Sequence, residues 1–123
     1  PDLSDDAIDA ALRCAVDWNL AGLVATNTTI ARPVAHDSGE AGGLSGRPLA
    51  PMARRVLRRL AASAPPSLTL VGVGGVMSGD DLYDRLADGA HLVQSYTGFV
   101  YAGPAFAATC LRGLAERMER EGL

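Results

Sequence analysis

The chain has 123 residues, enough for one ordinary domain and too few for two. Its hydrophobic fraction of 48% can supply a packed core, and its formal net charge of −3 gives no general reason to expect nucleic acid or an anionic membrane surface as a partner. No apolar run approaches the length of about eighteen residues that a membrane-spanning helix needs. The two cysteines form no metal or redox motif, so the simplest interpretation is a reduced, intracellular setting.

The first 48 residues predict a helix, a buried strand and a long loop. The helix is expected over Pro1–Asn19, with Ser4 as its N-cap. The strand Gly22–Thr28 is apolar on both faces at first, as buried parallel strands are, and becomes polar at its C-terminal end. Residues Ile30–Pro48 are rich in glycine and proline, and loops of this length in compact domains are often functional.

The next segment, Leu49–Ala62, predicts an amphipathic helix whose apolar stripe includes Val56, Leu57 and Leu60. Four arginines lie off this stripe, and they could suggest a nucleic-acid surface. Because the chain is acidic and no aromatic residues are interleaved with the arginines, a solvated outer helix face is the better interpretation. The four are Arg54, Arg55, Arg58 and Arg59.

The second half of the chain continues the alternation of strands and helices. Strands are expected over Leu68–Gly75 and His91–Thr97, with a short helix capped by Ser78 between them. A final helix follows Gly103 and Pro104. The predicted order is α-β-α-β-α-β-α, which indicates an α/β fold with parallel strands joined by right-handed crossovers. Trp18, Cys14 and Cys110 are expected to be packing residues.

Small or uncharged polar residues gather at the predicted C-terminal ends of the strands, where parallel α/β folds bind ligands. Each group has an ordinary structural explanation, such as a glycine turn, a loop cap or a packed tyrosine. Their occurrence at equivalent ends of successive strands nevertheless predicts a shared binding site, and none is a carboxylate, cysteine or histidine. The candidates are Thr26, Asn27 and Thr28, then Gly74 and Gly75, then Tyr96 and Thr97, with Ser45 and Gly46 from the long loop.

In a (β/α)8 barrel, the loops after the last two strands commonly bind phosphate through backbone N–H groups. Gly74-Gly75 and Tyr96-Thr97 match this arrangement if their strands are the seventh and eighth of such a barrel. Paired glycines then serve two purposes, since they make a tight turn and leave no side chain between the backbone and an anion.

Several motifs in order resemble those of a known family. VATNTTIARP, GGLSGRPL, VGVGGVMSGDD and DGAHLVQSYTGFVYAGP together resemble the C-terminal part of a dihydroorotate dehydrogenase, and are more similar to class 2, the quinone-dependent branch, than to class 1. The resemblance covers nearly the whole chain. It implies an α/β fold that is the C-terminal portion, about strands 6–8 with flanking helices, of an FMN-binding (β/α)8 TIM barrel, with residues 1–123 forming an incomplete part of that domain.

The resemblance also implies the chemistry and the partners. The family oxidises dihydroorotate to orotate in pyrimidine synthesis, and class 2 members pass the electrons to a membrane quinone, as peripheral proteins on the cytoplasmic side of the membrane. Carried over by motif, Asn27 and Thr28 would bind the substrate, and the remaining residues would bind FMN. Thr26 would contact the flavin, and Ser45 and Gly46 would approach its ring through the backbone. The phosphate would lie against the backbone N–H groups of Gly74, Gly75, Tyr96 and Thr97.

Other parts of the family's machinery are expected outside this sequence, namely the general base, a flavin-contacting lysine, the membrane-associating N-terminal helices and the rest of the barrel. Because the base and the lysine are expected elsewhere, we expect the segment to be inactive alone. Three strands cannot close an eight-stranded barrel, so its first strand is expected to keep an exposed edge. No catalytic residue and no metal ligand is predicted within it. Two alternatives remain open at this point, a non-catalytic phosphate- or flavin-binding module and a different FMN- or phosphate-binding barrel enzyme.

Overall fold

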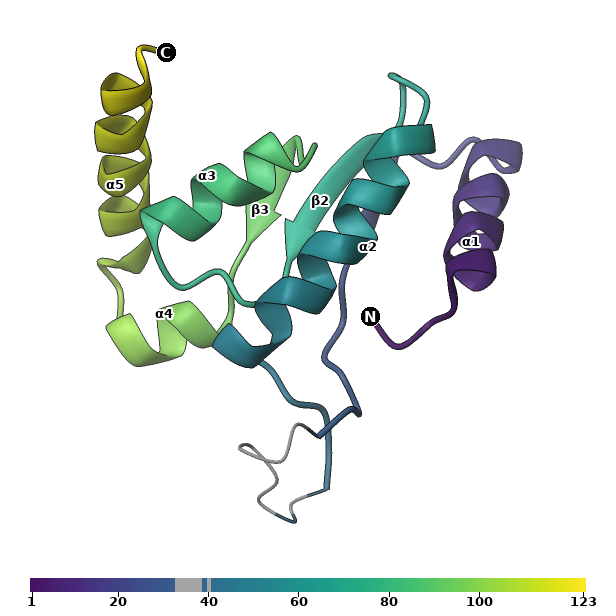
Figure 1. The fold of residues 1–123 in the computed structure, drawn as a ribbon, viewed down its shortest axis with the longest axis horizontal. Coiled ribbons are helices and arrows are strands. Elements are labelled where there is room, and N and C mark those ends of the chain that lie inside the picture. Colours follow the sequence, from purple (N-terminus) through teal and green to yellow (C-terminus); the bar gives the residue numbers. More distant parts are fainter. Residues whose placement is uncertain (33–38, 40) are drawn as a thin grey trace.

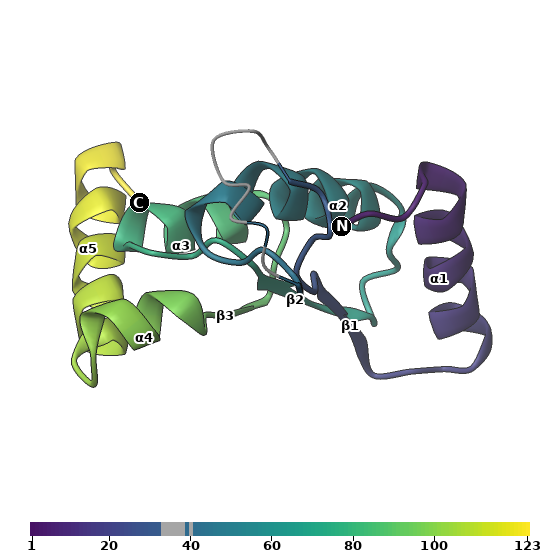
Figure 2. The same ribbon diagram turned by 90° about the horizontal axis from the view of Figure 1, so that it is seen from below.

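The structure is a computed structural model that describes residues 1–32, 39 and 41–123. Three parallel strands form one sheet in sequence order, β1 (Gly22–Ala25), β2 (Thr69–Val73) and β3 (Leu92–Gln94) (Figure 1; β1 is labelled in Figure 2). The helices are α1 (Asp5–Asp17), the short 3₁₀ helix η2 (Arg47–Leu49), α2 (Ala50–Ser63), α3 (Gly79–Ala87), α4 (Thr97–Ala102) and α5 (Phe106–Glu121). The predicted α/β alternation with parallel strands is confirmed.

Helices α2 and α3 cover one face of the sheet (Figure 2). On this face Leu57 of α2 and Leu70 of β2 belong to the same buried cluster. The register places Val24, Val71 and Leu92 in one row, which alternation along the strands directs to the opposite face. Val24 and Leu92 are 60% and 59% exposed, so in the described part of the chain this second apolar face is left uncovered.

The predicted N-cap of α1 is confirmed, but the helix spans Asp5–Asp17 rather than Pro1–Asn19, and two residues expected to pack are exposed. Ser4 caps the helix, its side-chain oxygen accepting from the Ala7 N–H at 3.3 Å. Trp18 and Cys14 were expected to pack, and both are exposed, Trp18 by 77%. Cys14 lies off the buried stripe of α1, and Trp18 lies at the C-cap beyond the last helical residue. Cys110 is buried in α5, as expected.

All three strands are shorter than predicted. The first was expected to reach Thr28, but pairing stops at Ala25, with one further bond from Thr26 N–H to the Val73 carbonyl at 2.8 Å. The central strand ends at Val73 because Gly74 and Gly75 turn with φ of 110° and 74°. Its neighbours then have no strand to pair with, so the polar residues at all three ends leave the sheet.

Helix α4 was not predicted, and Thr97, expected in the third strand, is its first residue. The sequence TGFVYA contains residues that favour strands. Tertiary packing overrides this preference at Gly98, where a Cβ would lie 2.6 Å from both the Phe106 ring and the Val76 carbonyl oxygen. Only glycine allows α4 to pack this closely.

The predicted loop Ile30–Pro48 is partly outside the described residues, which omit 33–38 and 40. Its two described ends are joined, because Thr29 and Leu44 exchange backbone hydrogen bonds of 3.1 and 2.8 Å. The loop ends earlier than expected, since η2 begins at Arg47 and leads directly into α2. The following helix runs to Ser63 rather than Ala62.

The arginines of α2 do not form a merely solvated face. Arg54 binds Asp84 of α3 at 2.6 Å and Asp88, the C-cap of α3, at 2.5 Å, and Arg59 binds Asp9 of α1 at 2.6 Å. Burial alone would raise the pKa of Asp88, but hydrogen bonds from Arg54 and Arg58 outweigh it and hold that pKa below its ordinary value. These arginines therefore tie α2 to the helices on either side of it.

None of the helices described over residues 1–32, 39 and 41–123 combines the length and the apolar character needed to cross a bilayer.

Candidate functional site

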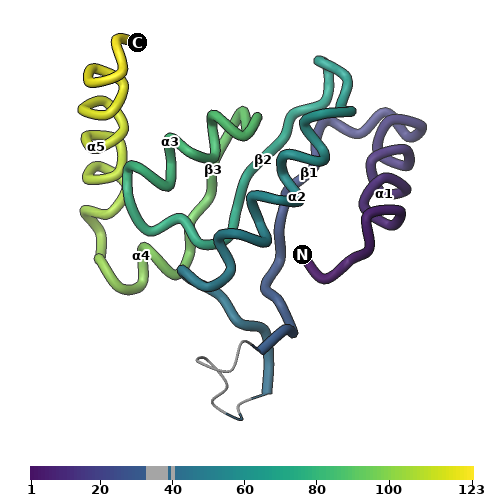
Figure 3. The backbone as a smooth tube through the Cα atoms, viewed as in Figure 1, coloured from purple at the N-terminus to yellow at the C-terminus, as the bar shows by residue number. Residues whose placement is uncertain are grey.

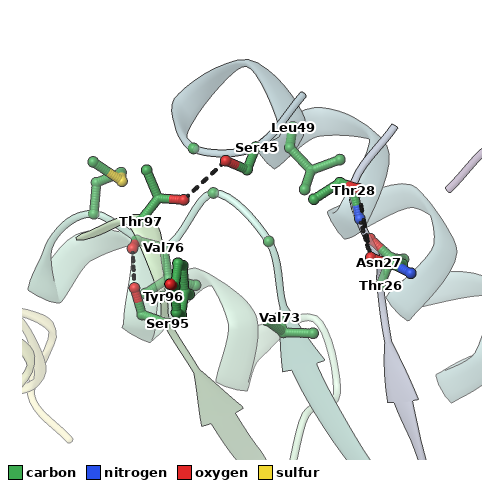
Figure 4. Close-up of a pocket in the computed structure, with 14 residues that line it drawn as sticks. Thr26, Asn27, Thr28, Ser45, Leu49, Val73, Val76, Ser95, Tyr96 and Thr97 are labelled. Atoms are coloured by element: carbon green, nitrogen blue, oxygen red, sulfur yellow. Dashed lines mark hydrogen bonds between the residues drawn. The ribbon is translucent and has the colours of Figure 1, made fainter. Parts of the chain in front are cut away.

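A cavity of about 300 Å³ lies at the C-terminal ends of the strands (Figure 4). Its walls come from four segments, the chain after β1, the loop before α2, the turn after β2 and the turn after β3. The structure brings together there all nine residues that the sequence singled out. They are Thr26, Asn27, Thr28, Ser45, Gly46, Gly74, Gly75, Tyr96 and Thr97.

The turn after β2 forms a floor built from backbone alone. A Cβ on Gly75 would lie 2.6 Å from the Cα and N atoms of Ala50, and a Cβ on Gly74 would lie 2.9 Å from Leu49 Cδ2. Both glycines also have positive φ, which side-chain-bearing residues rarely adopt. The helix start and the glycine turn therefore fit together only without side chains, and the peptide groups of the turn line the cavity directly.

The wall after β1 carries the polar groups of the Thr-Asn-Thr sequence. Asn27 Oδ1 accepts from the Thr28 N–H at 2.8 Å, which fixes the turn that leaves the strand. The hydroxyl oxygen of Thr26 is buried, and no hydrogen-bond partner for it exists among the described residues. A buried hydroxyl without a partner is costly, so this oxygen is suited to bond a ligand that enters the cavity.

Asp2 supports this wall from outside the cavity. The segment before α1 lies beside the chain that leaves β1 (Figure 3). The Asp2 carboxylate accepts hydrogen bonds from the Thr29 hydroxyl and, at 2.9 Å, from the Ile30 N–H. The hydrogen bonds from Thr29 and then Ile30 are the two main effects that lower the pKa of Asp2. Asp2 therefore anchors the chain directly after the Thr-Asn-Thr segment, from a position 27 residues before Thr29.

The opposite wall joins two loops that are distant in sequence. Thr97 Oγ1 donates to Ser45 Oγ at 3.0 Å, and a Cβ on Gly46 would lie 3.1 Å from Thr97 Cγ2 (Figure 4). Ser95 Oγ donates to the Val76 carbonyl at 2.7 Å, which ties the turn after β3 to the turn after β2. Tyr96 is 79% exposed, so the alternative explanation that Tyr96 is simply a packing residue is wrong.

Sequence reasoning missed five lining residues, Leu49, Val73, Val76, Met77 and Ser95. Two signals were available, because Ser95 lies between the strand and Tyr96, and Val76 directly follows the paired glycines. Leu49 gave no such signal, since its apolar side chain suggested only the start of a helix.

The cavity can hold a polar or anionic ligand but offers no strong acid or base of its own. Within the described part of the chain, its lining consists of hydroxyl, amide, apolar and glycine residues, with no carboxylate, arginine, histidine or cysteine. No group of three or more potential metal ligands was found among the described residues. The available chemistry is hydrogen bonding by neutral donors, a pattern suited to holding a phosphate or a heterocyclic ring.

A parallel sheet whose strand ends share one glycine-floored cavity makes this an α/β protein with a candidate ligand-binding site. Comparison with known proteins narrows this class, because the family model described as Dihydroorotate dehydrogenase matches residues 1–118. The chain therefore belongs to the dihydroorotate dehydrogenase family, as the resemblance in its motifs indicated.

Curated relatives share the quinone designation. The chain is 48% identical to the dihydroorotate dehydrogenase (quinone) of Corynebacterium efficiens over all of its length and 34% of that protein. It is also 48% identical to the protein of the same name from Roseiflexus castenholzii, over 99% of the chain and 34% of the relative. The chain thus spans about a third of the length of the curated relatives it matches.

Solved structures agree with this assignment. The crystal structure of DHODH from Eimeria tenella in complex with ferulenol matches with a TM-score of 0.93 and 34% identity, covering 100% of this chain and 33% of that one. The ligand-free structure of DHODH from the same organism gives the same TM-score and identity.

Proposed function

We propose that this chain is part of an FMN-dependent dihydroorotate dehydrogenase that oxidises dihydroorotate to orotate and uses a quinone as electron acceptor. The proposal is supported by the names of its relatives and by the single cavity on which the four polar segments converge. On this proposal, residues 1–123 belong to one FMN-binding barrel domain, and β1, β2 and β3 are its sixth, seventh and eighth strands.

The uncovered parts of the structure suit a place in a larger barrel. The apolar row of Val24, Val71 and Leu92 would face the barrel interior. A second cavity of about 420 Å³ lies along the edge strand β1, between Leu23, Ile8 and Val56. We infer that the preceding part of the barrel occupies it. Membrane attachment and the quinone contact would belong to other parts of a peripheral protein on the cytoplasmic side.

Three features of the cavity fit FMN. The glycine floor suits close approach of a phosphate, the buried Thr26 hydroxyl lacks a partner in the described chain, and the lining donors are neutral. When bound, FMN supplies the redox chemistry, and the protein supplies position and electrostatics. The residues of the floor and of the β3 turn, Gly74, Gly75, Tyr96 and Thr97, would hold the phosphate through their N–H groups. Thr26 and the Ser45-Gly46 backbone would contact the flavin ring.

Asn27 and Thr28 would orient the substrate. An amide side chain both donates and accepts hydrogen bonds, so Asn27 can bind the edge of a pyrimidine ring. No lining residue is a strong general base, and we expect that base to come from another part of the protein. Residues 1–123 alone, supplied with FMN and quinone, should therefore show no steady-state oxidation of dihydroorotate, and a measurable rate would overturn this expectation.

The decisive experiment uses the complete protein, purified and kept anaerobic. We expect it to be yellow and to be bleached by dihydroorotate, with orotate formed and with the colour restored by a quinone. Yellow protein that dihydroorotate does not bleach would instead indicate a flavin-binding module. Protein that binds no flavin but binds a sugar phosphate would indicate a different phosphate-binding barrel.

The role of Asn27 can be tested separately in the complete protein. Asn27→Ala should lower the rate of bleaching by dihydroorotate by about a hundredfold, the range seen when a group that positions a reacting substrate is lost, while flavin content stays near that of the wild type. Asn19→Gly is a matched control, because it removes the same amide from a position with φ of 49° at the far end of β1. Loss of flavin with normal reduction of what remains would contradict the assignment.

A further inference from the structure

A buried arginine lies directly behind the floor of the cavity. Arg85 is in the last turn of α3 and is only 1% exposed to solvent. Its Nη2 donates to the Gly74 carbonyl oxygen at 2.7 Å. Gly72 of β2 lies beside this side chain, since a Cβ built on it would lie 3.4 Å from Arg85 Cδ, an ordinary van der Waals contact, and 3.3 Å from Leu57 Cδ2. The arginine side chain therefore packs against the strand at this glycine, next to the turn whose carbonyl it binds.

No carboxylate is paired with this guanidinium within the described residues. The nearby acids Asp84 and Asp88 form their ion pairs with Arg54, Arg58 and Arg117 instead. The Arg85 Nε is buried, and no partner for it is found in the part of the chain that the structure describes. Burial is the main effect that lowers the pKa of Arg85, but a guanidinium remains charged at neutral pH. Among the described residues, the Gly74 carbonyl oxygen is therefore the hydrogen-bond acceptor of this guanidinium.

The hydrogen bond also fixes the direction of the floor peptide. The only cis peptide bond of the described chain is Ala25–Thr26, so the Gly74–Gly75 bond is trans. In a planar trans peptide the C=O and the N–H point in opposite directions. Because Arg85 binds the Gly74 carbonyl oxygen, the N–H of Gly75 points away from Arg85. Gly75 itself lines the cavity.

We propose that Arg85 is a positioning residue for phosphate binding, which orients the Gly74–Gly75 peptide and places a buried positive charge behind it. The ligand class is the phosphate monoester end of a flavin nucleotide, so this inference rests on the proposed function. The cavity lining itself is uncharged, so a full positive charge in the low-dielectric layer beneath it favours a dianion over a neutral ligand. A residue that merely filled space would favour both equally.

The test compares FMN with riboflavin, which has the same ring and no phosphate. Both dissociation constants are measured by flavin fluorescence on the flavin-free complete protein. Arg85→Met keeps an unbranched apolar stem and removes the charge and the hydrogen bond. We expect it to weaken FMN binding by about tenfold or more and to change riboflavin binding by less than about twofold. Equal losses for the two ligands, or no loss for either, would overturn the proposal.

A second variant covers the case in which Arg85→Met does not fold. Arg85→Lys keeps a cation, but a buried lysine has a lowered pKa and can lose its proton. The preference for FMN over riboflavin should then fall as the pH is raised from about 7 to about 9 in Arg85→Lys, and stay constant in the wild type. The charged groups that face Arg85 are Arg54 from α2, Asp81 and Asp84 from α3, and Asp88 at the C-cap of α3. A flat profile in Arg85→Lys would count against the proposal.

Arg112→Met is the matched control, because it removes an exposed arginine of α5 and should leave the preference unchanged. The outcomes also separate the two levels of inference. If the wild-type protein binds neither flavin, the proposed function and the role of Arg85 both fail. If the wild type prefers FMN and both Arg85 variants keep that preference, only the role of Arg85 fails.

Discussion

The cavity at the strand ends and the helical layer over the sheet use charge in different ways. In the helical layer, Arg59 joins α2 to Asp9 of α1, and Arg54 joins α2 to Asp88 at the C-cap of α3. Arg117 of α5 extends the series to α3, at 3.1 Å from Asp84. The cavity, in contrast, is lined by backbone, hydroxyl and amide groups without a charged side chain in the described chain. We infer that ion pairs hold the scaffold while neutral groups bind the ligand, so that stability and flavin binding should respond to different substitutions.

The largest effect is expected at the cavity floor. Gly75→Ala places a Cβ 2.6 Å from the Ala50 backbone and forces a side chain into φ of 74°. The turn must move, so FMN affinity should fall by about a hundredfold or more, and stability by about 3 kcal/mol. The measurement is FMN titration of the flavin-free complete protein together with its thermal unfolding.

Gly103 provides the control for this substitution. It has φ of 77°, and a Cβ there would have no neighbour within 4 Å. Gly103→Ala therefore carries the backbone strain without the collision, and should cost about 1 kcal/mol of stability with little change in FMN affinity. Equal effects of the two substitutions would show that the close contact with Ala50 has no part in forming the site.

The helical layer should show the reverse pattern. Asp88 accepts hydrogen bonds from Arg54 at 2.5 and 3.1 Å and from Arg58 at 2.6 Å, and its side chain is only 6% exposed. Asp88→Asn should lower the free energy of unfolding by about 2 kcal/mol and leave FMN affinity unchanged. Asp80→Asn is the control, since that side chain is 65% exposed and its ion pairs are long, at 3.5 and 3.8 Å. A large loss of FMN affinity in Asp88→Asn would break the separation between scaffold and site.

The pH dependence of stability should identify the same carboxylate. The pKa of Asp88 is lower in the folded protein than its ordinary value of 3.8. Its stabilising contribution is therefore fully present above that value and is lost as the pH falls through the folded pKa. The difference in unfolding temperature between the wild type and Asp88→Asn should narrow below about pH 4. A difference that stayed constant down to about pH 2.5 would assign the effect of Asp88→Asn to packing rather than to charge.

A smaller effect on FMN affinity is expected at the hydrogen bond that joins the turn after β3 to the loop before α2. Thr97→Val keeps the shape of the side chain and removes the hydroxyl that donates to Ser45. Loss of one such bond should weaken FMN binding by about fivefold, or about 1 kcal/mol, and Ser45→Ala should add little to it. Thr109→Val on the exposed face of α5 is the control. Additive losses from Thr97→Val and Ser45→Ala would show that the two hydroxyls act independently.

The sequence was most informative where the requirement was local. The periodicity of apolar residues predicted α1, α2 and α5, the cap at Ser78 predicted α3, and the apolar runs predicted the parallel strands. The positions of polar residues at strand ends predicted a shared site, and the nine candidates do share one cavity. Their individual roles toward flavin and substrate remain predictions.

Features that depend on tertiary contacts were not predictable from the sequence. The strands end early because Gly74 and Gly75 terminate the central strand, and α4 forms because Gly98 packs against Phe106. Nothing in the sequence pattern singled out Arg85, and only the folded chain places it against the Gly74 carbonyl. In each case the deciding partner is distant in sequence or belongs to another element.

The most direct test of the account is an experimental structure of the complete protein crystallised with FMN. We expect the phosphate to lie in the cavity between the turns after β2 and β3, with its oxygens about 3 Å from the backbone nitrogens of Gly75 and Thr97. An FMN whose phosphate lay outside this cavity, with the Gly75 N–H bonded elsewhere, would contradict the account.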